Sequence, residues 1–197
     1  GHDLGPPLFW THYSYLGLDP RQIVYRDRSY FEHFQNLCRV QIRYAESRRS
    51  VFKGYDSLWG ITASKGPDGY RAFAPGQMDN GTLAPTAPLA SMTYVPDESR
   101  ACLAELYGKY GGQLWGPFGF YDAFNLTRDW VAHHYLGIDV GPIAPMIENH
   151  RTGLCWRIFM RAPEIQQVLK RVATPQLLDA DLSVWQARDA AKDSKQF

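Results

Sequence analysis

The chain has 197 residues, enough for one domain of ordinary size or for part of a larger one. Its 21 Lys and Arg residues nearly balance its 20 Asp and Glu residues, and the net charge of +1 disfavours a protein that binds nucleic acid. The 45% content of hydrophobic residues excludes a disordered chain. No apolar stretch approaches the roughly 20 residues of a transmembrane helix, so a membrane span is not expected.

The first half of the chain is predicted to contain two helices separated by a long loop. Apolar residues at helical spacing predict a helix over residues 20–49, which Pro20 can start. Frequent Gly, Pro, Asp and Asn over residues 51–85 predict an irregular loop, and its aromatic residues argue against disorder. A short helix is expected over residues 85–92, with Pro88 in its first turn.

The second half begins with a helix expected from Pro96 to Tyr110, where Gly111 and Gly112 stop it. An aromatic, glycine-rich loop follows over residues 113–134. Further helical stretches are expected at residues 138–160 with one interruption, at residues 163–172 and at residues 179–192. Helices joined by long aromatic loops, without the alternation typical of strands, predict an all-α fold with the loops gathered at one end as a site.

The aromatic content gives a first indication of the ligand. The chain has 12 Tyr, 10 Phe and 6 Trp. Such rings offer a stacking face and a polar edge, which suits a sugar. A large core that uses Trp as filler explains the same composition, and composition does not separate the two interpretations.

The first aromatic loop offers four candidate sugar-binding residues. Trp59 and Tyr70 can stack on a pyranose face, and Thr62 and Asp68 can hydrogen-bond to hydroxyl groups. For Asp68 alone, a plain β-turn over residues 67–69 is the favoured explanation, because those residue types satisfy such a turn unaided.

The second aromatic loop has five aromatic rings within residues 115–124, more than one loop easily buries. Its phenylalanines are expected to form a satellite core under the loop. Asp122 and Asn125 lie among the rings as orienting polar groups. Tyr121 and Asp122 are the expected ligand contacts in this loop.

The third element places Asp139 near a helix start, between apolar residues and glycines. A carboxylate there can cap the helix or serve as a partly buried acid or base. Glu148 and Arg151 lie three residues apart on one helical face, which predicts an ion pair.

No motif predicts a metal or a cofactor. The chain lacks HExxH, GxSxG, a P-loop and a Rossmann fingerprint, and no cysteines flank its histidines at ligand spacing. The remaining chemistry is based on carboxylates. For a sugar ligand, this favours glycoside hydrolysis by one acid and one base.

Several runs of sequence resemble the glycoamylase-like family, which includes bacterial endo-β-1,2-glucanases. The runs are Pro7–Pro20, Trp59–Ser64, Asp79–Thr82, Gly119–Asn125 and Gly137–Leu154. The resemblance covers about residues 5–172, and residues 173–197 are expected to be a tail with a polar helix.

This resemblance implies an (α/α)6 toroid that cleaves β-1,2-glucan by an inverting route, in a bacterial protein that is periplasmic or secreted. Asp139 falls on the acid of the Gly-Ile-Asp-x-Gly-Pro motif and is the implied catalytic carboxylate. The cleft-forming segments imply a set of substrate-binding residues: Trp10, His12, Trp59, Thr62, Asp68, Tyr70, Tyr121, Asp122, Asn125, Glu148 and Arg151.

A complete domain of this family is much longer, and the chain resembles its C-terminal half. The resemblance therefore implies that an N-terminal half or a second copy completes the toroid and supplies the partner acid. Lys65 stands where the family often has an acid, and Pro145 interrupts an expected helix at a cost of roughly 3 kcal/mol. The alternatives are a non-catalytic carbohydrate-binding module and a structural fragment that needs a partner chain.

Overall fold

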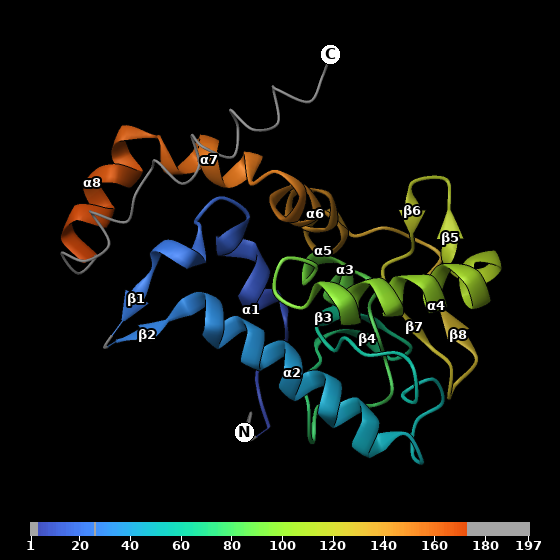
Figure 1. Ribbon diagram of the computed structural model, residues 1–197. Coiled ribbons are helices and arrows are strands. Elements are labelled where there is room, and N and C mark those ends of the chain that lie inside the picture. Colours follow the sequence, from blue (N-terminus) through green and yellow to red (C-terminus); the bar gives the residue numbers. More distant parts are fainter. Residues whose placement is uncertain (1–3, 26, 173–197) are drawn as a thin grey trace.

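A computed structural model describes residues 4–25 and 27–172 (Figure 1). The tail of residues 173–197 and its expected helix lie outside the described residues, so the domain boundary at residue 172 stays a prediction. The helices are α1 (Phe9–His12), α2 (Tyr30–Arg48), α3 (Thr86–Ala90), α4 (Pro96–Leu114), α5 (Gly137–Val140), α6 (Ile143–Arg151), α7 (Leu154–Met160) and α8 (Pro163–Val172), with 3-10 turns η1 (Tyr13–Leu16) and η2 (Pro20–Gln22).

The described part of the chain also contains four two-stranded antiparallel hairpins. They are β1 (Val24–Tyr25) with β2 (Arg28–Ser29), β3 (Ala63–Gly66) with β4 (Gly69–Ala72), β5 (Trp115–Gly116) with β6 (Gly119–Phe120), and β7 (Phe124–Asn125) with β8 (Trp130–Val131). The helix-rich fold is confirmed, but the expected absence of strands was wrong. Strands of two to four residues are too short to show an alternating pattern in the sequence.

The first long helix starts later than predicted. Residues 20–22 form η2, the hairpin β1–β2 follows, and α2 begins only at Tyr30. Ser29 caps α2 because its hydroxyl accepts a hydrogen bond from the backbone N–H of Glu32 at 3.3 Å. The apolar spacing that predicted one helix belongs to α2 alone.

Helix α4 ends later than predicted, at Leu114, and passes through Gly111 and Gly112. A glycine inside a helix costs about 1 kcal/mol, which packing of α4 can offset. Strand β5 follows directly, so the hairpin β5–β6 ends the helix and projects beyond it (Figure 1).

The interrupted apolar helix near the C-terminus consists of α5, α6 and α7. Gly153, with φ +70°, separates α6 from α7. Pro142 is the N-cap of α6, so Pro145 lies in the first turn, where its missing N–H needs no partner. The expected cost of Pro145 therefore does not arise, and Pro88 lies in the first turn of α3 as predicted.

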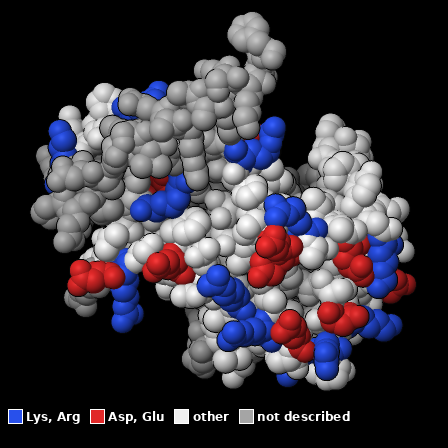
Figure 2. All heavy atoms as spheres, viewed as in Figure 1, with Lys and Arg blue, Asp and Glu red and all other residues white. Residues whose placement is uncertain are grey.

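The buried helix α3 lies at the centre of the fold and packs against α4 and α6 (Figure 1). Gln41 on α2 ties the loop before β3 to this core: its amide accepts from the N–H of Ile61 at 2.7 Å and donates to the Ile61 carbonyl at 2.8 Å. This clamp fixes the position of the hairpin β3–β4. Acidic and basic side chains are interspersed on the outer face that Figure 2 shows.

Candidate active site

Two buried carboxyl groups from different segments meet in the fold. Asp139 on α5 is 1% exposed, and Asp122, between β6 and β7, is 0% exposed. The two side chains are close enough that each influences the pKa of the other. The main-chain N–H of Lys65 on β3 also donates to Asp122 Oδ2 at 2.8 Å. The sequence reasoning selected both acids but did not place them together.

Two tyrosines bind the same oxygen of Asp139. The hydroxyl of Tyr13 in η1 donates to Asp139 Oδ1 at 2.9 Å, and the hydroxyl of Tyr70 on β4 donates to it at 3.0 Å. Tyr70 was expected to contact substrate, whereas Tyr13 was not selected. Tyr13 lies in the first run that resembles the glycoamylase-like family, which is the one signal that could have found it.

The hairpin β3–β4 contacts both acids at once. Lys65 and Tyr70 are directly opposite each other in its register. The backbone of Lys65 binds Asp122, and the side chain of Tyr70 binds Asp139. One rigid element therefore sets the relative position of the two carboxyl groups.

Burial changes the acidity of all these groups. Burial and the neighbouring Asp139 raise the pKa of Asp122 to about 7, although the Lys65 N–H opposes the shift. Burial also raises the pKa of Asp139, against the hydrogen bonds from Tyr13, Tyr70 and Asp122. Burial and the adjacent carboxylate raise the pKa of both tyrosines, so they stay protonated as donors. Such an acid pair is suited to proton transfer near neutral pH.

Tyr121, the other aromatic residue selected in the second loop, lines a separate small cavity. Its ring packs against His133 at 5.1 Å and against Tyr135 at 5.3 Å, measured between ring centroids. The cavity has a volume of about 400 Å³ and is also lined by Trp115 and Asp129. Its aromatic and polar lining is compatible with the expected sugar contact, which stays a prediction.

Several other predicted contact residues are buried and have structural partners. Thr62 accepts a hydrogen bond from the N–H of Phe9 at 2.9 Å, and Asn125 donates to the carbonyl of Asn80 at 3.0 Å. His12 lies 3.0 Å from the Ser91 hydroxyl, and burial lowers its pKa to about 3. Trp59 is 5% exposed. In this structure they hold the loops together, and their expected roles in substrate binding stay predictions.

The remaining predicted residues lie at the surface. The ring of Trp10 is 55% exposed. Asp68 lies in the turn of β3–β4, as predicted, and pairs with Arg128 at 3.1 Å. The expected ion pair between Glu148 and Arg151 is present, at 3.0 Å.

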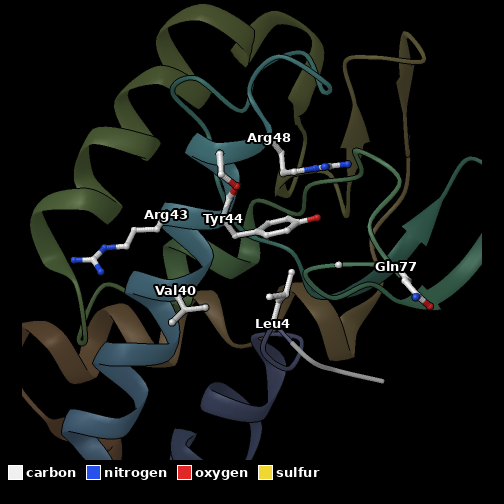
Figure 3. Close-up of a pocket in the computed structure, with 8 residues that line it drawn as sticks. Leu4, Val40, Arg43, Tyr44, Arg48 and Gln77 are labelled. Carbon is white, nitrogen blue, oxygen red and sulfur yellow. The ribbon is translucent and has the colours of Figure 1, made fainter.

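Another cavity lies away from the two acids. It has a volume of about 730 Å³ and is lined by α2 and by the loop at Gly76 and Gln77. Figure 3 shows Leu4 and Tyr44 pointing toward each other across it, and Arg43 pointing away. No acid of the candidate site lines this cavity, so it plays no part in the chemistry discussed below.

Within residues 4–25 and 27–172, no group of three or more His, Cys, Asp or Glu side chains could hold a metal ion. No helix in the same ranges is long and apolar enough to cross a membrane.

The sequence model of the Glycoamylase family, described as "Putative glucoamylase", matches residues 2–163. The chain belongs to this family. It is similar to an exo beta-1,2-glucooligosaccharide sophorohydrolase (non-reducing end) of Parabacteroides distasonis, with 43% identity over 170 residues. That match covers 85% of this chain and 24% of the relative.

Solved structures agree with this assignment. A "putative glucoamylase" from Bacteroides uniformis ATCC 8492 is 46% identical with a TM-score of 0.84, over 89% of this chain and 43% of that protein. An endo-beta-1,2-glucanase from Chitinophaga pinensis, in complex with sophorotriose and glucose, is 43% identical with a TM-score of 0.82. That match covers 86% of this chain and 41% of the glucanase. The chain thus spans less than half the length of these relatives.

Proposed function

We propose that this chain is part of a glycoside hydrolase that acts on β-1,2-glucan, with Asp139 as a catalytic carboxylate. This proposal rests mainly on the buried Asp139, whose Oδ1 accepts hydrogen bonds from Tyr13 and Tyr70. The named activities of the Parabacteroides and Chitinophaga relatives support the substrate class. Both relatives act on β-1,2-linked glucose, which agrees with the resemblance noted in the sequence.

The geometry of the acid pair bears on the proposed inverting mechanism. Inversion needs two carboxyl groups roughly 6.5–9.5 Å apart, with a water between them. Asp122 and Asp139 are close enough to interact directly, so this pair does not have the wider spacing that such a water requires. Asp122 is therefore not the partner acid. The partner acid comes from outside this chain, in an N-terminal half or a second copy that completes the (α/α)6 toroid.

The surroundings of Asp139 support a substrate cleft that another segment closes. Tyr70, whose hydroxyl binds Asp139, is 50% exposed, and Ile138 beside Asp139 is 65% exposed. Trp10 is exposed and can offer a stacking face to a sugar. We place the protein in the periplasm or outside the cell, where a bacterial enzyme meets a polymeric glucan.

The test compares Asp139→Asn with the wild type in the full-length protein. We expect a 10²- to 10⁴-fold loss of hydrolysis of linear β-1,2-glucan, the range of general acid or base catalysis, while glucan binding persists. Asp27→Asn is the matched control, because Asp27 is exposed with φ +60°, a conformation that Asn tolerates. An undiminished rate in Asp139→Asn removes Asp139 from the mechanism. Wild-type binding without any product favours a carbohydrate-binding module instead.

A further inference from the structure

The two buried acids have an incomplete set of hydrogen bonds. Asp122 Oδ2 accepts from the Lys65 N–H, and Asp139 Oδ1 accepts from Tyr13 and Tyr70. The other two oxygens, Asp122 Oδ1 and Asp139 Oδ2, are buried and have no donor among the described residues. A buried polar atom without a partner costs free energy, and two adjacent buried negative charges repel each other.

We propose that Asp122 Oδ1 and Asp139 Oδ2 share one proton, and that Asp122 is a positioning residue that keeps the pair at a single negative charge. One proton between these oxygens satisfies both of them and removes one of the two charges. Two ionised carboxylates offer acceptors only, so without a proton these two interacting acids would leave both oxygens unsatisfied.

The contacts also say which residue holds the proton. Asp139 Oδ1 receives two hydroxyl donors, whereas Asp122 Oδ2 receives one backbone N–H. The negative charge is therefore better stabilised on Asp139, and the proton resides on Asp122, which donates to Asp139 Oδ2. The raised pKa of Asp122, about 7, agrees with this assignment.

The same neighbours determine the pH dependence of the pair. Tyr13 faces it from η1, Tyr70 from β4 and the backbone of Lys65 from β3, while the Asp122 N–H donates to the carbonyl of His134 at 3.1 Å. The side chains that act on the pair are acids and phenols, and none of them carries a positive charge that would offset a second negative charge. Above about pH 7 the shared proton passes to solvent, and Asp139 loses the donor that fixes its Oδ2.

Infrared difference spectroscopy of the full-length protein at pH 6 tests the sharing without any substrate. We expect the C=O stretching band of one protonated carboxyl in the wild type. It should be absent from both Asp122→Asn and Asp139→Asn, and present in the control Asp27→Asn. A band that persists in Asp139→Asn shows that Asp122 holds its proton alone and overturns the proposal. Absence of the band from the wild type overturns it as well.

Kinetics test the positioning role, which rests on the proposed function of Asp139. In Asp122→Asn the amide keeps an acceptor for Lys65 and a donor for Asp139 but has no acidic proton to lose. At pH 6 we expect kcat/KM of Asp122→Asn to lie within about tenfold of the wild-type value. The wild type should lose activity as the pH rises through about 7, and this loss should be absent from the variant. Asp122→Ala, which lacks both groups, should lose activity at every pH.

These results separate the two proposals. An inactive wild type that still shows the shared-proton band contradicts the hydrolase and leaves the proton pair intact. An active wild type without the band retains the hydrolase and refutes the pair. If Asp122→Asn keeps the alkaline loss of activity, Asp122 does not act through Asp139.

Discussion

The hydroxyl of Tyr70 stabilises the ionised form of Asp139, so its removal should make this acid weaker. A hydrogen bond to a charged acceptor is worth about 1.5–3 kcal/mol. Tyr70 is 50% exposed, so water replaces part of what Tyr70→Phe removes. The lower bound, about 1.5 kcal/mol, corresponds to about one pKa unit. The pKa of Asp139 should therefore rise by about one unit, because the lost donor favoured the charged form.

The assay is the pH dependence of kcat/KM for β-1,2-glucan hydrolysis. If Asp139 acts as the ionised base, the acidic limb of the profile moves up by about one pH unit in Tyr70→Phe, because a higher pH is needed to ionise it. Tyr13→Phe should shift the limb in the same direction, since Tyr13 donates to the same oxygen. The control is Tyr107→Phe, on the exposed face of α4. An acidic limb that stays in place in Tyr70→Phe refutes the assigned role of this hydrogen bond.

Two further predictions concern the elements that position the site. Gln41→Leu leaves the buried N–H of Ile61 without its acceptor. Urea denaturation should show that this variant lowers the free energy of unfolding by about 2–4 kcal/mol. The control is Asn36→Leu, at an exposed position on the same helix, which should change the free energy of unfolding by less than about 1 kcal/mol. Gly60 and Gly69 have nearly the same φ, +116° and +122°, so Ala is strained to a similar degree at both positions. The added Cβ at Gly60 would lie 2.5 Å from the ring of Pro88 in α3, whereas the added Cβ at Gly69 would meet open space. Gly60→Ala should therefore destabilise the protein by about 1–3 kcal/mol more than Gly69→Ala in thermal unfolding, and equal effects would show that the contact with α3 relaxes freely.

The sequence was sufficient for the long helices and for the family, because both depend on patterns that extend over many residues. The sequence was misleading where a glycine or proline suggested a local break that the surrounding structure accommodates. Gly111 and Gly112 indicated a helix end, but the packing of α4 carries the helix through them. Pro145 indicated a kink, but Pro142 moves the helix start and makes Pro145 harmless. Both errors arise because local propensities are small beside tertiary contacts.

For the candidate site, the sequence could identify individual residues but not the contacts between them. Asp139 could be selected because a motif surrounds it, and Asp122 because it lies among aromatic residues. Their contact could not be predicted, because it depends on how two loops fold over one another. Tyr13 is separated from Asp139 by 126 positions in the chain, and no spacing rule connects residues so far apart. Long-range hydrogen bonds of this kind become visible only in three dimensions.

The described residues of this chain supply several contacts that set the charge of Asp139. Two donors bind Oδ1, Asp122 faces Oδ2, and the hairpin β3–β4 holds both acids in one register. The partner acid of an inverting hydrolase needs a separation of several ångströms from Asp139, and the proposed function assigns it to another segment. Under the proposed function the two tasks are therefore physically separate. This chain tunes the protonation of one catalytic group, and the remainder of the enzyme supplies the second group and the opposite wall of the cleft.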